Sequence, residues 1–206
     1  NTTGNYNTAM GNAALDANTT GGLNVAIGNG ALSGNTTADG NTAVGTNALL
    51  ANTTGTQNVA VGSTALDANT TASNNTAVGY GALTASTTGA SNTGVGHSAL
   101  EALTTGASNT AIGKNAVYAA TTGSYNTGVG QGSLSGTTTG ATNTAVGYAA
   151  GDAITTGSNN VVIGYNNDVD TGGADVRFGL GVNLNLDAGN TMKIGNGSTF
   201  ITNTWG

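Results

Sequence analysis

The stretch Asn75-Thr76-Ala77-Val78-Gly79 decides the fold, because closely similar five-residue segments recur along most of the chain. Ten such segments end on a glycine, each 17 residues after the last, with no insertion or deletion. These glycines are Gly11, Gly28, Gly45, Gly62, Gly79, Gly96, Gly113, Gly130, Gly147 and Gly164. We number this glycine as position 0 of the repeat. A strict period indicates units that stack on one another, because one extra residue would disturb every later contact.

The other positions of the repeat are nearly as regular. Position −4 is always Asn, position −1 is always apolar, and positions +8 and +9 are Thr in all nine complete units. Seventeen residues hold two short strands and two turns but not a helix pair. The many Thr and Val residues favour strands, and the glycines at 0 and +10 suit corners with positive φ or close backbone approach. The sequence predicts an all-β fold, a parallel β-solenoid of ten 17-residue coils.

The asparagine column runs from Asn7 to Asn160. In a solenoid these ten side chains stack above one another, and we expect their amides to hydrogen-bond along the axis. The alternative is that Asn only tolerates a turn conformation at this position. With coils about 4.8 Å apart, the ten coils make a rod about 50 Å long.

Two pairs of neighbouring positions in each unit are apolar: −2 with −1, as in Ala77-Val78, and +3 with +4, as in Ala99-Leu100. Successive strand residues point to opposite faces, so these pairs predict two buried faces. One would line the lumen and the other would contact another chain, and the sequence leaves open which is which. A monomer would instead expose an apolar stripe, which is an aggregation hazard. We therefore expect a symmetric homo-oligomer.

Composition excludes several classes of function. Three Lys and Arg against nine Asp and Glu give a net charge of −6, which disfavours nucleic-acid binding. The absence of Cys rules out a disulfide framework and a Cys-based zinc site. No apolar run approaches the roughly 20 residues of a membrane helix, so we expect no membrane insertion by this segment. Any leader or anchor is expected outside this chain.

Catalytic chemistry has few candidates. His97, the single histidine, stands at the variable position +1 and is expected to be a solvated turn residue. Asp16, Asp67 and Glu101 occupy drifting positions, and nothing specifies the cleft that an acid–base pair needs. Residues 166–175 are acidic but lack the Gly and Glu of an EF-hand, so a polar turn is preferred over a calcium loop. We predict no catalytic, cofactor-binding or metal residues, and no enzyme.

Three further patterns concern ligands on the surface. Stacked threonines can bind ice, but adjacent Thr residues point to opposite sides, which leaves one outward rank and disfavours this function. Segments that match the N-glycosylation acceptor pattern include those that begin at Asn18, Asn35, Asn52 and Asn69. An accidental match or Thr-linked glycans stay open. Five tyrosines at variable positions are candidates for stacking on sugars, but we do not expect one dense patch on adjacent coils; they are Tyr80, Tyr118, Tyr125, Tyr148 and Tyr165.

The repeated core Asn-x-Ala-Val/Ile-Gly-x-x-Ala resembles the YadA-like head repeats of trimeric autotransporter adhesins. The fuller form, Thr-Thr-Gly-x-x-Asn-Thr-Ala-Val-Gly-x-x-Ala-Leu, is similar to repeats in phage tail fibres, which often end in an endosialidase-type chaperone. The resemblance covers residues 1–165 and implies a left-handed parallel β-roll that trimerises about a central axis. The adhesin head repeat is shorter than the unit here, which adds the Thr-Thr-Gly segment.

The repeat decays after Gly164. Gly181 keeps the spacing, but Arg177 takes the place of Asn and the Thr pair is lost. Alternating residues predict short strands; they run through Val182, Leu184 and Leu186, through Met192 and Ile194, and through Phe200 and Ile201. We divide the chain into a solenoid shaft over residues 1–165 and a C-terminal β cap or transition segment over residues 166–206.

These expectations combine into one functional hypothesis. The chain is expected to be a structural subunit of an extracellular trimeric fibre, on a cell or virion surface, that projects or provides an attachment function. The alternative is a binding module that recognises a cell-surface glycan or host receptor with its variable outward positions +1, +2, +5, +11 and +12. The sequence leaves open whether the source is a phage or a bacterium.

Overall fold

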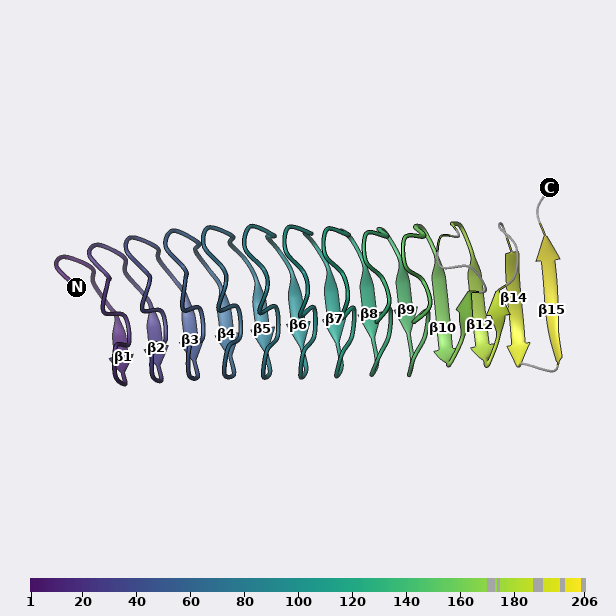
Figure 1. Cartoon of the computed structure of the whole chain (residues 1–206), viewed down its shortest axis with the longest axis horizontal. Helices are drawn as coiled ribbons and strands as arrows, with labels where there is room; N and C mark the ends of the chain where they lie inside the picture. Colours follow the sequence, from purple (N-terminus) through teal and green to yellow (C-terminus); the bar gives the residue numbers. More distant parts are fainter. Residues whose placement is uncertain (170–172, 174, 187–190, 197–198, 205–206) are drawn as a thin grey trace.

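The computed structural model describes residues 1–169, 173, 175–186, 191–196 and 199–204, and these residues form a long rod of stacked coils (Figure 1). Within them, thirteen strands form one sheet in the order β1-β2-β3-β4-β5-β6-β7-β8-β9-β10-β12-β14-β15, and β11 pairs with β13 in a second, two-stranded sheet. None of the described residues is helical. The predicted all-β parallel solenoid is confirmed, whereas its handedness and its trimeric state stay predictions.

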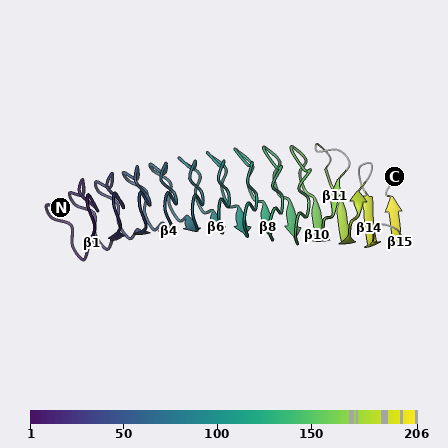
Figure 2. The ribbon, with the colours of Figure 1, turned by 60° about the horizontal axis from the view of Figure 1, so that its bottom comes forward.

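Each coil of the shaft contributes one short strand. The strands are β1 (Thr8–Met10), β2 (Val25–Ile27), β3 (Thr42–Val44), β4 (Val59–Val61), β5 (Thr76–Val78), β6 (Thr93–Val95), β7 (Thr110–Ile112), β8 (Thr127–Val129), β9 (Thr144–Val146) and β10 (Val161–Tyr165). They are followed by β11 (Asp168–Val169), β12 (Phe178–Val182), β13 (Asn185–Leu186), β14 (Thr191–Asn196) and β15 (Thr199–Thr204). The strands lie along one edge of the rod and the connecting loops lie on the opposite side (Figures 1 and 2).

The register follows the repeat. Val78 pairs with Val95 in the next coil, and β10 pairs with β12 at the same spacing, with Val161 opposite Phe178. The sheet therefore runs on across residue 165, where the repeat sequence begins to decay. The step from β12 to β14 is shorter, with Phe178 opposite Met192, and β15 then pairs with β14 in the antiparallel direction.

The strands predicted beyond the repeat are found with one correction. Strands through Met192 and Ile194 and through Phe200 and Ile201 are present as β14 and β15. A continuous strand from Val182 to Leu186 is wrong. Asn183 has a φ of 52°, and this left-handed residue interrupts the extended chain between β12 and β13.

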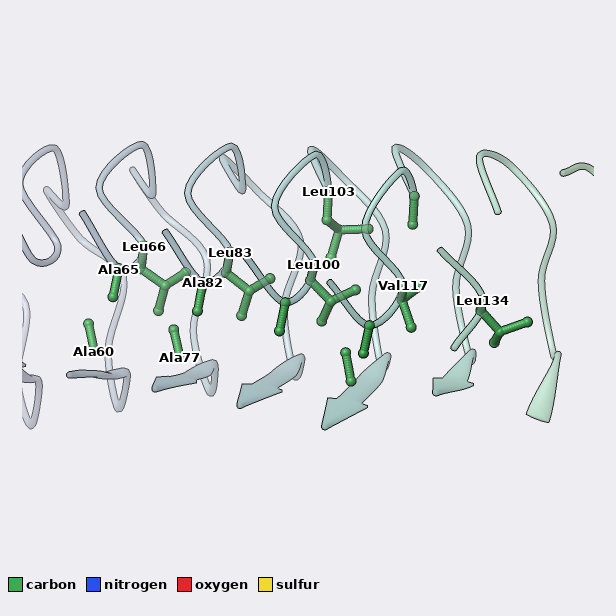
Figure 3. Packing of buried hydrophobic residues seen from close by; sticks show 14 of the residues in the cluster. Ala60, Ala65, Leu66, Ala77, Ala82, Leu83, Leu100, Leu103, Val117 and Leu134 are labelled. Atoms are coloured by element: carbon green, nitrogen blue, oxygen red, sulfur yellow. The ribbon is translucent and has the colours of Figure 1, made fainter. Parts of the chain in front are cut away.

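The second half of each coil is built from turns, in place of the second short strand that 17 residues could hold. Non-glycine residues have positive φ at positions −5, +2 and +4 in most coils; Leu83, at +4, has a φ of 56°. This conformation costs roughly 1–2 kcal/mol for an ordinary residue. It rotates the chain so that Ala82 and Leu83 both point into the interior, where both are fully buried (Figure 3).

The lumen is therefore lined by positions −2, +3 and +4, as Ala77, Ala82 and Leu83 show (Figure 3). Position −1 points outward and is only half buried, as at Val78. This answers which apolar face is the lumen. It also removes half of the evidence for a second buried face, because the +3 and +4 pair does not straddle a strand.

Hydrogen bonds join the coils along the loops as well as along the strands. The backbone N–H of Leu83 donates to Ala99 O at 3.0 Å, and that of Thr87 donates to Thr104 O at 3.0 Å. Buried backbone groups need such partners, and here the neighbouring coil supplies them. The regular 17-residue spacing is thus required along the loops of the coil, not only in the three-residue strand.

The two repeated glycine positions differ in their roles. Gly79, at position 0, has a φ of 137°, and an added Cβ would lie 2.4 Å from the carbonyl oxygen of Gly96. Only glycine fits such a position, as predicted. Gly89, at position +10, does not have a positive φ, and Ala38 and Ala72 occupy the same position in other coils. An added Cβ on Gly89 would lie 2.2 Å from the carbonyl oxygen of Gly106, so of the two alternatives predicted for +10 the close backbone approach is confirmed and the positive φ is not found.

Candidate functional surface

The asparagine column is internal and structural. Asn75 is fully buried; its Oδ1 accepts from the backbone N of Asn92 at 2.8 Å, and its Nδ2 donates to Gly89 O at 2.9 Å. Direct bonds between amides, such as Asn109 Nδ2 to Asn92 Oδ1 at 3.1 Å, occur in only some coils. The stacked column is confirmed, but each side chain mainly satisfies backbone groups. These asparagines are unavailable to a ligand.

A second column of buried amides occupies position +7 in the first four coils. Asn35 Nδ2 donates to Asn18 Oδ1 at 2.9 Å, and the chain of bonds continues through Asn52 to Asn69. These are the four residues named above for the N-glycosylation pattern, and each exposes 1% of its surface or less. The buried Nδ2 atom of each is engaged, so the folded chain cannot carry a glycan there.

The paired threonines have two different environments. At position +8 the hydroxyl group donates to a backbone carbonyl of the next coil, as from Thr53 Oγ1 to Thr70 O at 3.0 Å. At position +9 the side chain is exposed, as at Thr54. Each pair thus provides a single outward rank, which is the geometry that disfavours an ice-binding array.

An acidic pair lies where the leucine column of the lumen ends. Gly151 and then Asp168 take the +4 position that leucine holds in most coils. Asp168 accepts hydrogen bonds from the backbone N of Ala153 at 3.0 Å and of Val169 at 2.8 Å. Burial, followed by a hydrogen bond with the carboxyl of Asp152, raises the pKa of Asp168 to about 7. Two neighbouring carboxyl groups are more stable when one of them stays protonated than when both are ionised.

This pair does not amount to a metal centre. Among the described residues, no group of three or more His, Cys, Asp or Glu side chains converges on a point. Part of the acidic segment 166–175, considered above as a calcium loop, lies outside the described residues. Asp16 is exposed, and Asp67 accepts a hydrogen bond from Thr84 at 2.6 Å. Asp16, Asp67 and Glu101 stand on separate coils, as their spacing predicts.

Position +1 carries three of the six exposed tyrosines of the chain. Tyr80 stacks on His97, and Tyr148 stacks on Tyr165, each with ring centroids 5.3 Å apart. His97 is exposed in a turn, as expected. Tyr148 and Tyr165 meet on adjacent coils as a single pair, not as the dense patch of five that the sequence argued against. Their 17-residue separation was the signal that predicts this contact.

The basic side chains are distributed unevenly, and all four lie among the described residues. Arg177 and Lys193 are buried and donate to the backbone carbonyls of Leu186 and Asn185. Lys114 and His97 are exposed. They occupy position +1 on consecutive coils, so the only exposed basic side chains of this chain lie in the same column as the two aromatic pairs.

Comparison with family models, with curated proteins and with solved structures finds no match to this chain. In the part of the chain that the structure describes, no helix is long and apolar enough to cross a membrane. The likeness to YadA-like head repeats therefore stays a prediction that depends on the repeat motif alone.

Proposed function

We propose that this chain is a structural subunit of an extracellular trimeric fibre that projects or provides a surface-attachment function. The observation that carries the proposal is the apolar column at position −1 on the outer face of the sheet. It contains Val, Ile or Met in all ten coils. Ile112 and Val146 remain 43% and 37% exposed. An uncharged column of this length is unusual on a free surface.

The free energy available from this column is modest for each coil and large for the rod. Covering the exposed part of a Val, which is about a third of its surface or less in most coils, contributes up to about 1 kcal/mol at roughly 25 cal/mol per Å². Ten coils therefore contribute up to about 10 kcal/mol for each chain, which is comparable to the 4–15 kcal/mol that association costs, roughly. The leucines add nothing, because they already fill the lumen. Association thus depends on the length of the shaft.

The extracellular setting and the trimer come from the resemblance to adhesin and tail-fibre repeats. A rod with hydrogen bonds between all its coils suits a spacer that holds a binding surface away from a cell or virion. Its lack of charge on the sheet face suits contact with copies of itself. A cell-surface glycan or host receptor would then be the target of the fibre.

Light scattering of the purified chain under native conditions tests this proposal. We expect a mass three times the 19.7 kDa of one chain. A well-folded monomer at micromolar concentration would overturn the trimer while leaving the solenoid fold intact.

The second candidate function is a binding module that uses variable outward positions. One observation favours it: three of the six exposed tyrosines share position +1, whereas the others lie at positions −5 and +5. Tyr118 and Tyr125, on other columns, show that outward tyrosines are also tolerated elsewhere. The stacked pairs Tyr80–His97 and Tyr148–Tyr165 are what distinguish the +1 column.

A further inference from the structure

We propose that the +1 column of the last six coils of the shaft binds a linear acidic glycan lying along the rod. The members of this column are Tyr80, His97, Lys114, Gln131, Tyr148 and Tyr165, and all six are exposed. The inference deepens the attachment function proposed above by naming a site and a ligand class. It does not require association, because each chain presents the whole column.

The column changes character halfway along the rod. In the first four coils position +1 holds small polar residues, which are Asn12, Asn29, Thr46 and Ser63. The coil conformation is the same in both halves, since the glycine before each residue has a φ near 135° throughout the shaft, as at Gly45 (139°) and Gly113 (134°). The fold therefore does not require a large side chain at this position. The concentration of large side chains in the second half points to a ligand.

The aromatic members supply flat apolar surface with polar tips. Tyr80, Tyr148 and Tyr165 are 59%, 49% and 53% exposed. Stacking holds each pair of rings in place, so the rings lose less conformational entropy when a ligand binds. Sugar rings present both apolar C–H faces and hydroxyl groups. An ordered tyrosine pair therefore offers flat rings to the C–H faces of the sugars and hydroxyl groups to the sugar hydroxyls.

The charge of the column indicates that the ligand is acidic. Lys114 and His97 are the only exposed basic side chains of a chain whose net charge is −6. They stand between the two tyrosine-containing ends of the column, and Gln131 adjoins them. A carboxylate on the bound chain would find its only complementary charge there. A nucleic acid fits less well, because one phosphate for every unit would face a strongly acidic protein with a single exposed Lys.

The spacing of the column indicates an extended chain. Five coil steps separate Tyr80 from Tyr165, which is about 24 Å at about 4.8 Å for each step. Three steps, or about 14 Å, separate His97 from Tyr148. A single sugar contacts one pair at most. A linear oligosaccharide parallel to the axis contacts both pairs and passes over Lys114 between them. The binding free energies of these contacts then add together.

Isothermal titration calorimetry of the full chain with three probes tests the inference. The probes are a hyaluronan oligosaccharide, which carries a carboxylate on alternate sugars, a neutral cello-oligosaccharide of equal length, and an oligo-dT strand. We expect the hyaluronan fragment to bind most tightly and to weaken as salt is added. The absence of hyaluronan binding, equal binding of the neutral sugar, or tighter binding of oligo-dT would each overturn the acidic-glycan assignment.

Variants locate the site. The double change Tyr148→Ser and Tyr165→Ser is expected to weaken hyaluronan binding about tenfold. Lys114→Gln is expected to weaken it about threefold and to flatten its salt dependence. The matched controls Tyr118→Ser and Tyr125→Ser remove exposed tyrosines from other columns and should change affinity less than twofold. Equal losses in the controls would overturn the site. Circular dichroism verifies that each variant keeps its β signal.

The same samples separate this inference from the trimer proposal. Light scattering reports the mass, and calorimetry reports the binding. A monomer that binds hyaluronan through the column supports the inference and overturns the trimer. A trimer that binds none of the three probes overturns the inference and leaves the fibre proposal standing.

Discussion

The side-chain oxygen of Asn75 accepts a 2.8 Å hydrogen bond from the backbone N–H of Asn92, one coil further along the rod. The same bond links every asparagine of the column from Asn7 to Asn143 with the backbone N–H of the next asparagine. At the end of the column, Asn160 Oδ1 accepts from the backbone N–H of Arg177 at 3.0 Å. The bond supplies a partner for an N–H group at the position where each strand begins.

Replacement of Asn75 by Ala is expected to destabilise the shaft by about 2–4 kcal/mol. The change leaves the buried backbone N of Asn92 and the carbonyl of Gly89 without the partners that Asn75 provides, and each such group costs about 1–3 kcal/mol. Urea unfolding followed by circular dichroism measures the difference. Thr88→Ala, which alters an exposed side chain in the same region, should change stability by less than about 0.5 kcal/mol. Equal stability of the two variants would contradict this role of the column.

The end of the second amide column offers a stabilising change. Asn69 Oδ1 and Ser86 Oγ are both buried without a hydrogen-bond partner among the described residues. Ser86→Asn extends the column by one coil, so that the new amide donates to Asn69 Oδ1 as Asn69 donates to Asn52 at 2.8 Å. The change leaves one unpartnered oxygen in place of two, and we expect a gain of about 1 kcal/mol.

Thermal unfolding of the Ser86→Asn variant measures that gain as a rise in the melting temperature. Ser86→Ala provides the control, because it removes one unpartnered oxygen without supplying a donor to Asn69. A lower melting temperature for Ser86→Asn than for Ser86→Ala would show that the extended column does not form.

The acidic pair at the end of the shaft predicts how stability depends on pH. The pKa of Asp168 is raised from 3.8 to about 7 in the folded chain. Between these values the folded chain holds a proton that the unfolded chain has released. Stability from this group is therefore present below about pH 4 and is lost as the pH rises towards 7. The loss arises because ionised Asp168 is buried beside Asp152.

The variant Asp168→Asn tests this dependence. Its amide keeps an acceptor for the backbone N of Ala153 or Val169 and cannot ionise. We expect wild type and variant to unfold at similar temperatures at pH 4, and the variant to be the more stable at pH 8. Thermal unfolding from pH 4 to pH 9 measures both curves. Parallel curves would show that Asp168 carries no raised pKa.

The sequence predicted features that depend on the period and missed features that depend on backbone conformation. The stacked column of Asn75 and its relatives, the parallel strands and the constraint on Gly79 all follow from an unbroken 17-residue spacing. The left-handed conformation of Leu83 did not follow, since leucine rarely adopts it. Alternation along a strand would place positions +3 and +4 on opposite faces, so the sequence alone does not decide which face the leucines occupy.

In the candidate site, too, some features follow from the 17-residue period and others depend on the folded conformation. The residues at position +1 are variable and outward in the repeat pattern, and the 17-residue period places them in one column. Stacking of Tyr148 on Tyr165 required only their 17-residue separation. The burial of Asn35 could not be read from its sequence pattern, because the match to a glycosylation acceptor describes three residues and says nothing of the amide column inside the coil.

The orientation of Val78 and Leu83 separates two effects that the sequence alone would group together. Val78 is half buried on the outer face of the sheet, whereas Leu83 is fully buried in the lumen. We expect Val78→Asp to split the proposed trimer into folded monomers, because a charge on the −1 column opposes association at a dry interface. Leu83→Asp should instead unfold the shaft locally, because it places an unpaired charge in the interior.

Light scattering and circular dichroism on the same samples distinguish the two outcomes. Val78→Asp is expected to lower the mass to that of one chain with the β signal unchanged, and Leu83→Asp is expected to lower the β signal. Lys114→Gln, on the outward +1 column, should alter neither quantity and provides the control. A Val78→Asp variant that keeps the mass of a trimer would place the interface elsewhere than on the outer face of the sheet. The half-exposed Val and Ile side chains would then have to be covered by some other partner or remain in contact with water.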